Sequence, residues 1–212
     1  MRPGSLIVFE GLDGSGISTQ AKRLAEHKGT RGVEIVHTQQ PSEGPVGAVL
    51  KEMLASDGVL GKPVSLRTLS LLFAADRTDH LQRVVEPALD RGAIVICERW
   101  YLSSLAYQRT GVDRDWITSL NAHARRPNIT VFLQVRPEVA RQRRVTAGRT
   151  DEYFHQLSTQ KDVEAGYRVT IAELKAEGER IEIVDGEKTV DAVFAAVLEA
   201  TGGDAASTQR SS

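Results

Sequence analysis

A glycine-rich segment near the start of the chain, residues 9–19, contains the residue types that bind phosphate. It reads Phe-Glu-Gly-Leu-Asp-Gly-Ser-Gly-Ile-Ser-Thr. Gly11, Gly16 and Ser18 occupy defined positions of the pattern Gly-x-x-x-x-Gly-Lys-Ser/Thr, whose backbone N–H groups surround a phosphate and whose hydroxyl faces a magnesium ion. Ile17 stands at the position of the lysine. The segment therefore predicts a phosphate-binding loop that lacks one positive charge.

Strand and helix signals flank this loop in the order that the pattern requires. Residues 6–9 form an apolar run, and Ala21, Leu24 and Ala25 begin a helical spacing directly after the loop. The positive end of that helix would face a bound anion. An ordinary glycine-rich turn is the alternative, and the flanking elements favour phosphate binding. The residues expected at nucleotide phosphates are Gly11, Gly14, Ser15, Gly16, Ile17, Ser18 and Thr19.

The missing lysine requires another cation at the phosphates. Its loss removes a charge-assisted contact worth roughly 1.5–3 kcal/mol, and the loss of a preorganised donor costs about 100- to 1,000-fold in rate. Lys22 is a poor replacement, because it lies about 140° round the helix from residue 17. Arg141, Arg143, Arg144 and Arg149 fall within nine residues and are better candidates, and because Arg143 and Arg144 lie about 100° apart on a helix, only one of those two is expected to face a given phosphate. A solvated basic helix face is the alternative for these arginines.

A second group of residues could hold a flat base. Phe73 and Arg77 lie four residues apart, on one face of a predicted helix over residues 71–80. A buried Phe73 with a solvated Arg77 is the alternative reading. Glu98 and Arg99 end an apolar strand, at the carboxyl edge where open α/β sheets bind their ligands. An aromatic ring, an amide and two hydroxyls follow within residues 103–108.

The elements that must position these side chains follow an α/β pattern. Apolar strand-like runs near residues 5–10, 33–37, 93–98, 129–135 and 180–185 alternate with helical spacings, which predicts a parallel sheet covered on both faces. Pro87 and Gly92 are expected to close a long helix that begins near Val64. A buried helix face over residues 163–174 should stop at Gly178, and residues 190–198 should form the last helix.

Composition excludes several classes of protein. The 212 residues include 27 basic and 28 acidic side chains, so the protein has no large net positive charge that would attract nucleic acid. No run approaches the roughly 20 apolar residues of a membrane span, and a reducing cytoplasm is the expected location. Cys97 is the only cysteine, so a disulfide framework is excluded and a small core residue is expected. The histidines lack metal-ligand spacing and are expected in surface or capping roles: His27, His37, His80, His123 and His155.

Four segments together resemble the thymidylate kinase family, whose members phosphorylate dTMP with ATP. The segments read FEGLDGSG-ST, LLFAADR, ERWYLSSLAYQ and RQRRVTAGRTDEYF, and the resemblance runs from about Leu6 to Val197. It implies a P-loop nucleoside monophosphate kinase fold, with a five-stranded parallel sheet flanked by helices. It also implies a lid near residues 143–157. The length indicates one domain over residues 1–200, and the small, polar residues 201–212 are expected to be a disordered tail. A homodimer that uses ATP and Mg²⁺ is expected.

The resemblance assigns roles residue by residue. In the family the helix phenylalanine stacks on thymine and the following arginine hydrogen-bonds it, while the tyrosine lies against deoxyribose and disfavours a 2′-hydroxyl. The positions that imply dTMP binding are Phe73, Arg77, Arg99, Ser104, Tyr107, Gln108 and Lys51, with Arg99 and Lys51 at the phosphate. The implied catalytic residues are Glu98, Arg143, Arg144, Arg149 and Asp13, and Ser18 and Glu98 are the implied magnesium ligands. In the family the lid supplies arginines that close over the γ-phosphate, so Arg149 and one of Arg143 or Arg144 are expected to replace the charge of the missing lysine.

Departures from the family pattern fall on the phosphate side. Glu98-Arg99-Trp100 replaces Asp-Arg-Tyr or Asp-Arg-His, and Gln39-Gln40-Pro41 replaces Arg-Glu-Pro. Two hypotheses follow: a working dTMP kinase in which lid arginines replace the lysine, or a degenerate homologue that binds a nucleotide or a partner. A kinase for another small phosphoacceptor is a third, which the intact thymine-side residues disfavour.

Overall fold

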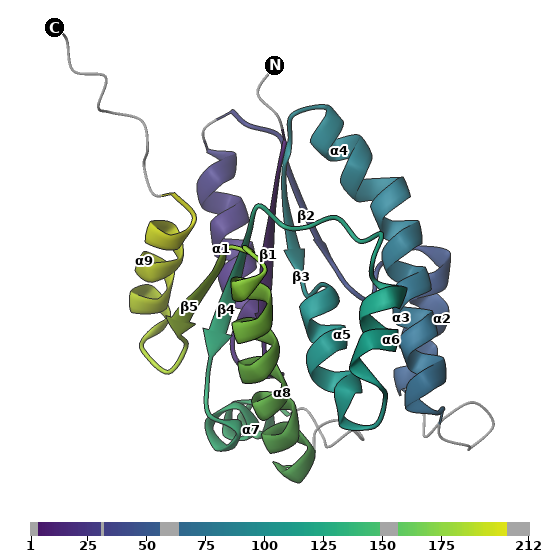
Figure 1. Ribbon diagram of the computed structural model, residues 1–212. Coiled ribbons are helices and arrows are strands. Elements are labelled where there is room, and N and C mark those ends of the chain that lie inside the picture. Colours follow the sequence, from purple (N-terminus) through teal and green to yellow (C-terminus); the bar gives the residue numbers. More distant parts are fainter. Residues whose placement is uncertain (1–3, 31, 56–63, 149–156, 203–212) are drawn as a thin grey trace, which may run out of the picture.

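A central sheet organises the protein. Figure 1 shows the computed structural model, which describes residues 4–30, 32–55, 64–148 and 157–202. Within these residues five parallel strands pair in the order β2-β3-β1-β4-β5. The strands are β1 (Ser5–Gly11), β2 (Ile35–Gln39), β3 (Ile94–Glu98), β4 (Ile129–Gln134) and β5 (Ile181–Asp185). The predicted α/β fold with a five-stranded parallel sheet is confirmed.

Helices connect the strands and cover both faces of the sheet (Figure 1). They are α1 (Ile17–Gly29), α2 (Pro45–Ala55), α3 (Leu66–His80), α4 (Glu86–Asp90), α5 (Tyr101–Tyr107), α6 (Arg114–Leu120), α7 (Pro137–Thr146), α8 (Leu157–Ala176) and α9 (Val190–Ala200). Two short turns complete the set, the π-helical η1 (Leu81–Val85) and the 3-10 helix η2 (Gln108–Thr110). No helix in the described part of the chain is both long and apolar enough to cross a bilayer.

Alternation along β1 divides the core into two layers. Ile7 and Phe9 pack against α1 and α9, together with Leu24 and Val197. The intervening side chains of β1 point to the opposite face, towards α4, α5 and α8. The predicted face of α8 is confirmed, since its members are all buried: Val163, Tyr167, Thr170, Ile171 and Leu174. Cys97 is fully buried on this side, as expected for a small core residue.

Of the two residues predicted to close the long helix before β3, Gly92 lies just after its end, whereas Pro87 lies within it. The prediction that Pro87 closes it is wrong, because the helix continues to Asp90, before Gly92 with φ 84°. The turn η1 explains the difference: the Glu86 N–H bonds to the Leu81 carbonyl oxygen, five residues back. This wider turn restarts the helix, so Pro87 lies in the first turn of α4, where a missing N–H costs little.

Candidate functional site

The loop between β1 and α1, called here the P-loop (residues 11–18), leaves a helix N-terminus open to solvent. Gly16 has φ 101°, and no side chain caps the start of α1. The first N–H groups of a helix have no intrahelical partner, and the helix dipole favours an anion at that end. The loop therefore has the geometry of a phosphate site.

The P-loop packs closely against α7, the helix that carries Arg143 and Arg144. A Cβ built on Gly14 would lie 2.4 Å from the carbonyl oxygen of Ala140, and Gly14 has φ 91°. Arg143 Nη1 lies 3.5 Å from the carbonyl oxygen of Ser15, on the same loop. Glycine at 14 thus lets the arginine-bearing helix approach the loop.

This packing predicts that Gly14→Ala destabilises the protein by about 1–3 kcal/mol and weakens ATP binding. The added methyl group would clash with the backbone of α7, and alanine is unfavourable at this positive φ. Gly178→Ala is the matched control: Gly178 has φ 86°, but a Cβ there meets nothing within 4 Å. Urea unfolding and calorimetric titration with ATP measure the two effects. An equal loss in both variants would contradict a role for the approach of α7.

Ile17 packs in the core, and its side chain offers no charge to the phosphate site. It is 7% exposed and belongs to the core cluster that contains Phe9, Leu24, Val193 and Val197. Its side chain also lines a cavity of about 490 Å³ beside the P-loop. The lysine position of the loop is thus part of the apolar layer between the sheet, α1 and α9.

This cavity beside the P-loop is called here the donor-side cavity, because the phosphates of a donor nucleotide are expected there. Positively charged side chains from three other elements line it. Arg99 follows β3, Arg143 and Arg144 come from α7, and Lys188 comes from the segment between β5 and α9. Arg144 is 4% exposed, whereas the Lys188 side chain is 63% exposed. The sequence prediction named the arginines and missed Lys188, which is the one lysine among the described lining residues. The cavity holds several positive groups despite the isoleucine.

Two side chains with oxygen atoms that could bind a metal ion, Ser18 and Glu98, meet in the lining of the same cavity. Ser18 Oγ donates to Glu98 Oε2 at 2.5 Å, and His37 Nε2 lies 2.9 Å from Glu98 Oε1. Burial alone would raise the pKa of Glu98, but the hydrogen bonds from His37 and Ser18 outweigh it and lower the pKa below its usual value. Mg²⁺ prefers oxygen ligands and binds through one or two carboxylates plus substrate phosphates and water. Ser18 and Glu98 fit that chemistry.

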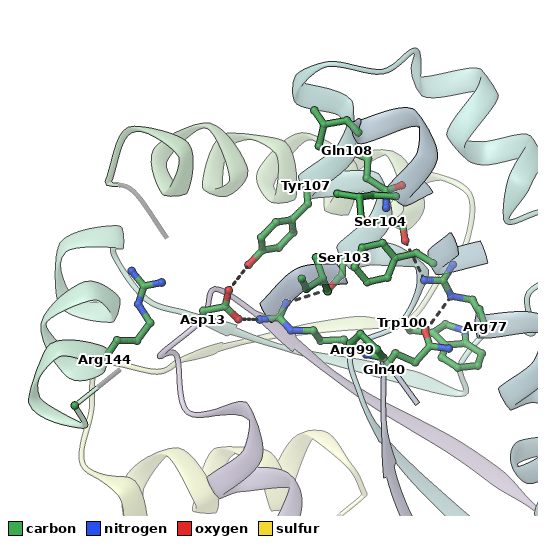
Figure 2. Close-up of a pocket in the computed structure, with 16 residues that line it drawn as sticks. Asp13, Gln40, Arg77, Arg99, Trp100, Ser103, Ser104, Tyr107, Gln108 and Arg144 are labelled. Atoms are coloured by element: carbon green, nitrogen blue, oxygen red, sulfur yellow. Dashed lines mark hydrogen bonds and ion pairs between the residues drawn. The ribbon is translucent and has the colours of Figure 1, made fainter. Parts of the chain in front are cut away.

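A second cavity, of about 590 Å³, adjoins the first. Figure 2 shows it, with Arg77, Ser104 and Gln108 towards one end and Arg99, Asp13 and Arg144 towards the other. Phe73, Leu66 and Leu69 from α3 form part of its apolar lining. Its lining includes six of the seven residues predicted to hold the base, sugar and phosphate: Phe73, Arg77, Arg99, Ser104, Tyr107 and Gln108.

Neutral acceptors hold the buried Arg77 guanidinium. Its Nε donates to Gln40 Oε1 at 3.1 Å and its Nη2 donates to Ser104 Oγ at 2.9 Å, while Nη1 donates to Asn121 Oδ1. Burial lowers the pKa of Arg77 to about 10. Gln40, which stands at the glutamate position of the Arg-Glu-Pro pattern, is therefore engaged with the base-side arginine, in the wall between the two cavities.

The same contacts fix the state of His80, which is buried on α3. Because Gln40 Oε1 accepts from Arg77, its amide nitrogen faces His80 Nδ1 at 3.5 Å. Nδ1 must then accept, and Nε2–H donates to Thr38 Oγ1 at 2.8 Å. Burial lowers the pKa of His80, so the ring is neutral in the folded protein. The expectation of a surface or capping role for this histidine is wrong.

We expect His80 to reduce stability as the pH falls. Its folded pKa is below its unfolded value of about 6.5, so acidification through that value protonates only the unfolded chain. When the pH is lowered from about 7.5 to 5.5, the melting temperature of His80→Gln should therefore fall less than that of the parent. The control is His123→Gln, at an exposed position. Identical acid profiles of parent and His80→Gln would contradict the prediction.

Arg99 forms the wall between the cavities, since it lines both. It has φ 66°, and its Nη1 donates to the Gly11 carbonyl oxygen, to Ser103 Oγ and to Tyr167 Oη at 3.1–3.2 Å. Nη2 pairs with Asp13. Burial works to lower the pKa of Arg99, but the Asp13 carboxylate outweighs it and raises the pKa well above the usual range.

Glu10 fixes the backbone around Arg99, and the sequence prediction missed it. The fully buried Oε1 accepts from the N–H groups of Trp100 and Ser103, and Oε2 accepts from the hydroxyls of Ser103 and Tyr167 at 2.6 and 3.0 Å. Burial raises the pKa of Glu10 despite the attraction of Arg99. A carboxylate within an apolar strand was the available signal, because an acidic residue is almost never fully buried without partners.

The remaining predicted residues lie as follows. Tyr107 Oη donates to Asp13 Oδ2 at 3.4 Å, and Figure 2 shows Asp13 between Arg99 and Arg144. Lys51, on α2, pairs with Glu43 and is not among the described residues that line either cavity. Gly14, Gly16, Ser18 and Thr19 line the donor-side cavity, whereas Gly11 and Ser15 are not among the described residues that line it. Arg149 and most of the predicted lid lie outside the described residues, as does the tail from residue 203.

These features together define a class of protein. A parallel sheet in the order β2-β3-β1-β4-β5, with a P-loop leading into α1, is a P-loop nucleoside monophosphate kinase fold. The family model described as thymidylate kinase matches residues 9–197. The chain belongs to the thymidylate kinase family.

Curated relatives agree with this assignment. The chain is 34% identical over 192 residues to a probable thymidylate kinase of Pyrococcus abyssi, covering 90% of this chain and 92% of the relative. It is 36% identical over 166 residues to a probable thymidylate kinase of Pyrococcus horikoshii, covering 77% and 81%. A thymidylate kinase of Symbiobacterium thermophilum is 36% identical over 197 residues, covering 88% and 87%.

Proposed function

We propose that the protein transfers the γ-phosphate of ATP to dTMP, giving ADP and dTDP, at a rate reduced by Ile17. The observation that carries this proposal is the shared wall of the two cavities: Asp13, Gln40, Pro41, Arg99 and Arg144 line both. A donor in one cavity and an acceptor in the other would bring their phosphates to the same cations. Positioning and charge neutralisation are the main contributions of a protein to phosphoryl transfer.

Three features of the second cavity, called here the acceptor cavity, support a thymine monophosphate as its ligand. An aromatic ring at Phe73 offers a stacking surface, and the fixed guanidinium of Arg77 beside Ser104 offers hydrogen bonds to a base. Tyr107 bonds to Asp13 and its ring lies against the Arg99 guanidinium, so a sugar held beside Arg99 would meet this ring and have little space for a 2′-hydroxyl. The phosphate would then face Arg99 and Arg144.

In the transfer, an oxygen of the dTMP phosphate bonds to the γ-phosphorus, and the bond from that phosphorus to the bridging oxygen of ADP breaks. The P-loop N–H groups would bind the donor phosphates, while Arg143 and Arg144 would neutralise charge that the lysine normally meets. Ser18 and Glu98 would hold Mg²⁺, which neutralises phosphate charge when bound. Asp13 would orient Arg99. Arg149 in the lid and Lys51 near the acceptor phosphate remain proposals from the family resemblance alone.

Formation of dTDP from dTMP and ATP, followed by chromatography, tests the proposal directly. The expected result is dTDP formation that requires both nucleotides and Mg²⁺, and that falls steeply in Phe73→Ala or Arg77→Met. A parent chain that forms no dTDP at high enzyme concentration would overturn the proposal.

A degenerate homologue that binds a nucleotide or a partner is the second candidate, and the burial of Ile17 favours it. Ile17, at the lysine position of the loop, packs in the core, where it contributes to stability and offers no charge to a phosphate. Thermal shifts with dTMP and Mg-ATP separate the candidates, since a ligand at about 100 times its Kd adds about 2.7 kcal/mol. Stabilisation by dTMP without stabilisation by ATP would support the degenerate homologue.

We further propose that the protein works as a homodimer in the cytoplasm, as the family resemblance implies. Light scattering after size-exclusion chromatography tests the dimer, and a mass near the 23.2 kDa of one chain would contradict it.

A further inference from the structure

His37 and Glu98 lie on neighbouring strands and point to the same side of the sheet. The register of β2 and β3 pairs His37 with Ile96 and Gln39 with Glu98, so His37 is the diagonal neighbour of Glu98 on that face. His37 Nε2 lies 2.9 Å from Glu98 Oε1. An ionised carboxylate can only accept, so the imidazole donates.

Each oxygen of the Glu98 carboxylate thus has its own partner, His37 on one side and Ser18 on the other. Glu98 stands where the family pattern has an aspartate, and its extra methylene adds rotamers that must be frozen to place the carboxylate. A hydrogen bond from a neighbouring strand supplies that restriction. Partners that hold a ligating carboxylate typically contribute to metal affinity without touching the metal.

We propose that His37 is a positioning residue that holds the Glu98 carboxylate towards Ser18, in the orientation that binds the divalent cation of the donor nucleotide. The proposal rests on the proposed function, which places Mg²⁺ at Ser18 and Glu98. In this chain the longer acidic side chain and the histidine form one unit: the imidazole fixes the arm that the extra methylene lengthens.

A simple cross-strand ion pair is the competing explanation. The His37 side chain is 32% exposed, and exposed pairs contribute little to stability. In that case, removal of His37 would change neither the metal affinity nor the orientation of Glu98. The metal affinity therefore separates the two explanations, whereas the melting temperature does not.

The test compares the parent with His37→Leu, which removes the donor, and His37→Gln, which keeps an N–H donor at similar reach. His123→Leu, at an exposed histidine outside both cavities, is the control. Mn²⁺ affinity is measured by electron paramagnetic resonance with adenylyl imidodiphosphate present, so no turnover occurs. We expect His37→Leu to weaken Mn²⁺ binding about 10- to 100-fold and His37→Gln to stay within about threefold of the parent. Calorimetric affinity for dTMP should be unchanged in all variants.

Four outcomes would overturn the proposal. These are unchanged Mn²⁺ affinity in His37→Leu, a glutamine variant no better than the leucine variant, equal loss of dTMP and Mn²⁺ binding, and a parent that binds no Mn²⁺ with the analogue. Failure of the proposed function is distinguishable, because a parent that binds Mn²⁺ and the analogue in a His37-dependent way but forms no dTDP would refute only the kinase activity.

Discussion

Replacing Ile17 with lysine should raise the kcat of the proposed dTMP phosphorylation by about 100- to 1,000-fold, the usual effect of one preorganised donor on developing charge. The aliphatic stem of a lysine can follow the apolar surface that Ile17 now contacts, while its ammonium group reaches the P-loop phosphates. A coupled ADP assay with dTMP as the acceptor measures the change.

Ile17→Met is the matched control, since it lengthens the side chain without adding charge. It should leave kcat within a fewfold of the parent and cost less than about 1.5 kcal/mol in stability. Ile17→Lys should be less stable than the parent, because part of a buried apolar side chain is lost from the core. Activity that appears only in Ile17→Lys would support the degenerate homologue. An active parent with no gain in the lysine variant would contradict the expected increase.

Arg144→Met should lower kcat about 1,000-fold, the lower end of the effect of an arginine that neutralises transferring phosphate. Arg144 lines both cavities and is 4% exposed, so its guanidinium has little access to bulk solvent. KM for dTMP should change much less, because Arg99 remains at the acceptor phosphate. Steady-state kinetics with varied dTMP separates the two parameters.

The control lies on the same helix: Arg141→Met changes an exposed arginine one turn earlier, outside both cavities. It should leave kcat unaffected. A double-mutant cycle with Ile17→Lys then shows whether Arg144 does the work of the lysine, since its loss should cost less when lysine is present. Additive losses would show that the two positions act independently.

Much of the fold could be predicted from local signals. Apolar runs separated by helical spacings located all five strands, since a parallel sheet buried on both faces leaves continuous apolar segments. Pro87 was misread, because the π turn that admits it depends on one backbone bond between Glu86 and Leu81 and leaves no periodic signature. Here the π turn lets Pro87 lie in the first turn of a new helical segment.

The site could be predicted only where its residues lie close together in the sequence. Phe73 and Arg77 share a helix face, and spacing alone brings them together. Glu10 and Tyr167 could not be paired in advance, because 157 positions separate them and only the closed fold places their oxygens 3.0 Å apart. Likewise, the sequence indicates that residue 17 lacks a charge, but the direction of its side chain depends on α9.

The wall shared by the two cavities makes their occupancy reciprocal. A triphosphate that draws Arg144 and Arg99 towards it alters the field felt by a monophosphate on the other side. Whatever factor the first nucleotide applies to the affinity of the second, the second must apply to the first. Under the proposed function each substrate would thus be an effector of the other, and calorimetric titration of each nucleotide with and without an unreactive analogue of the other would give the size and sign of that interaction.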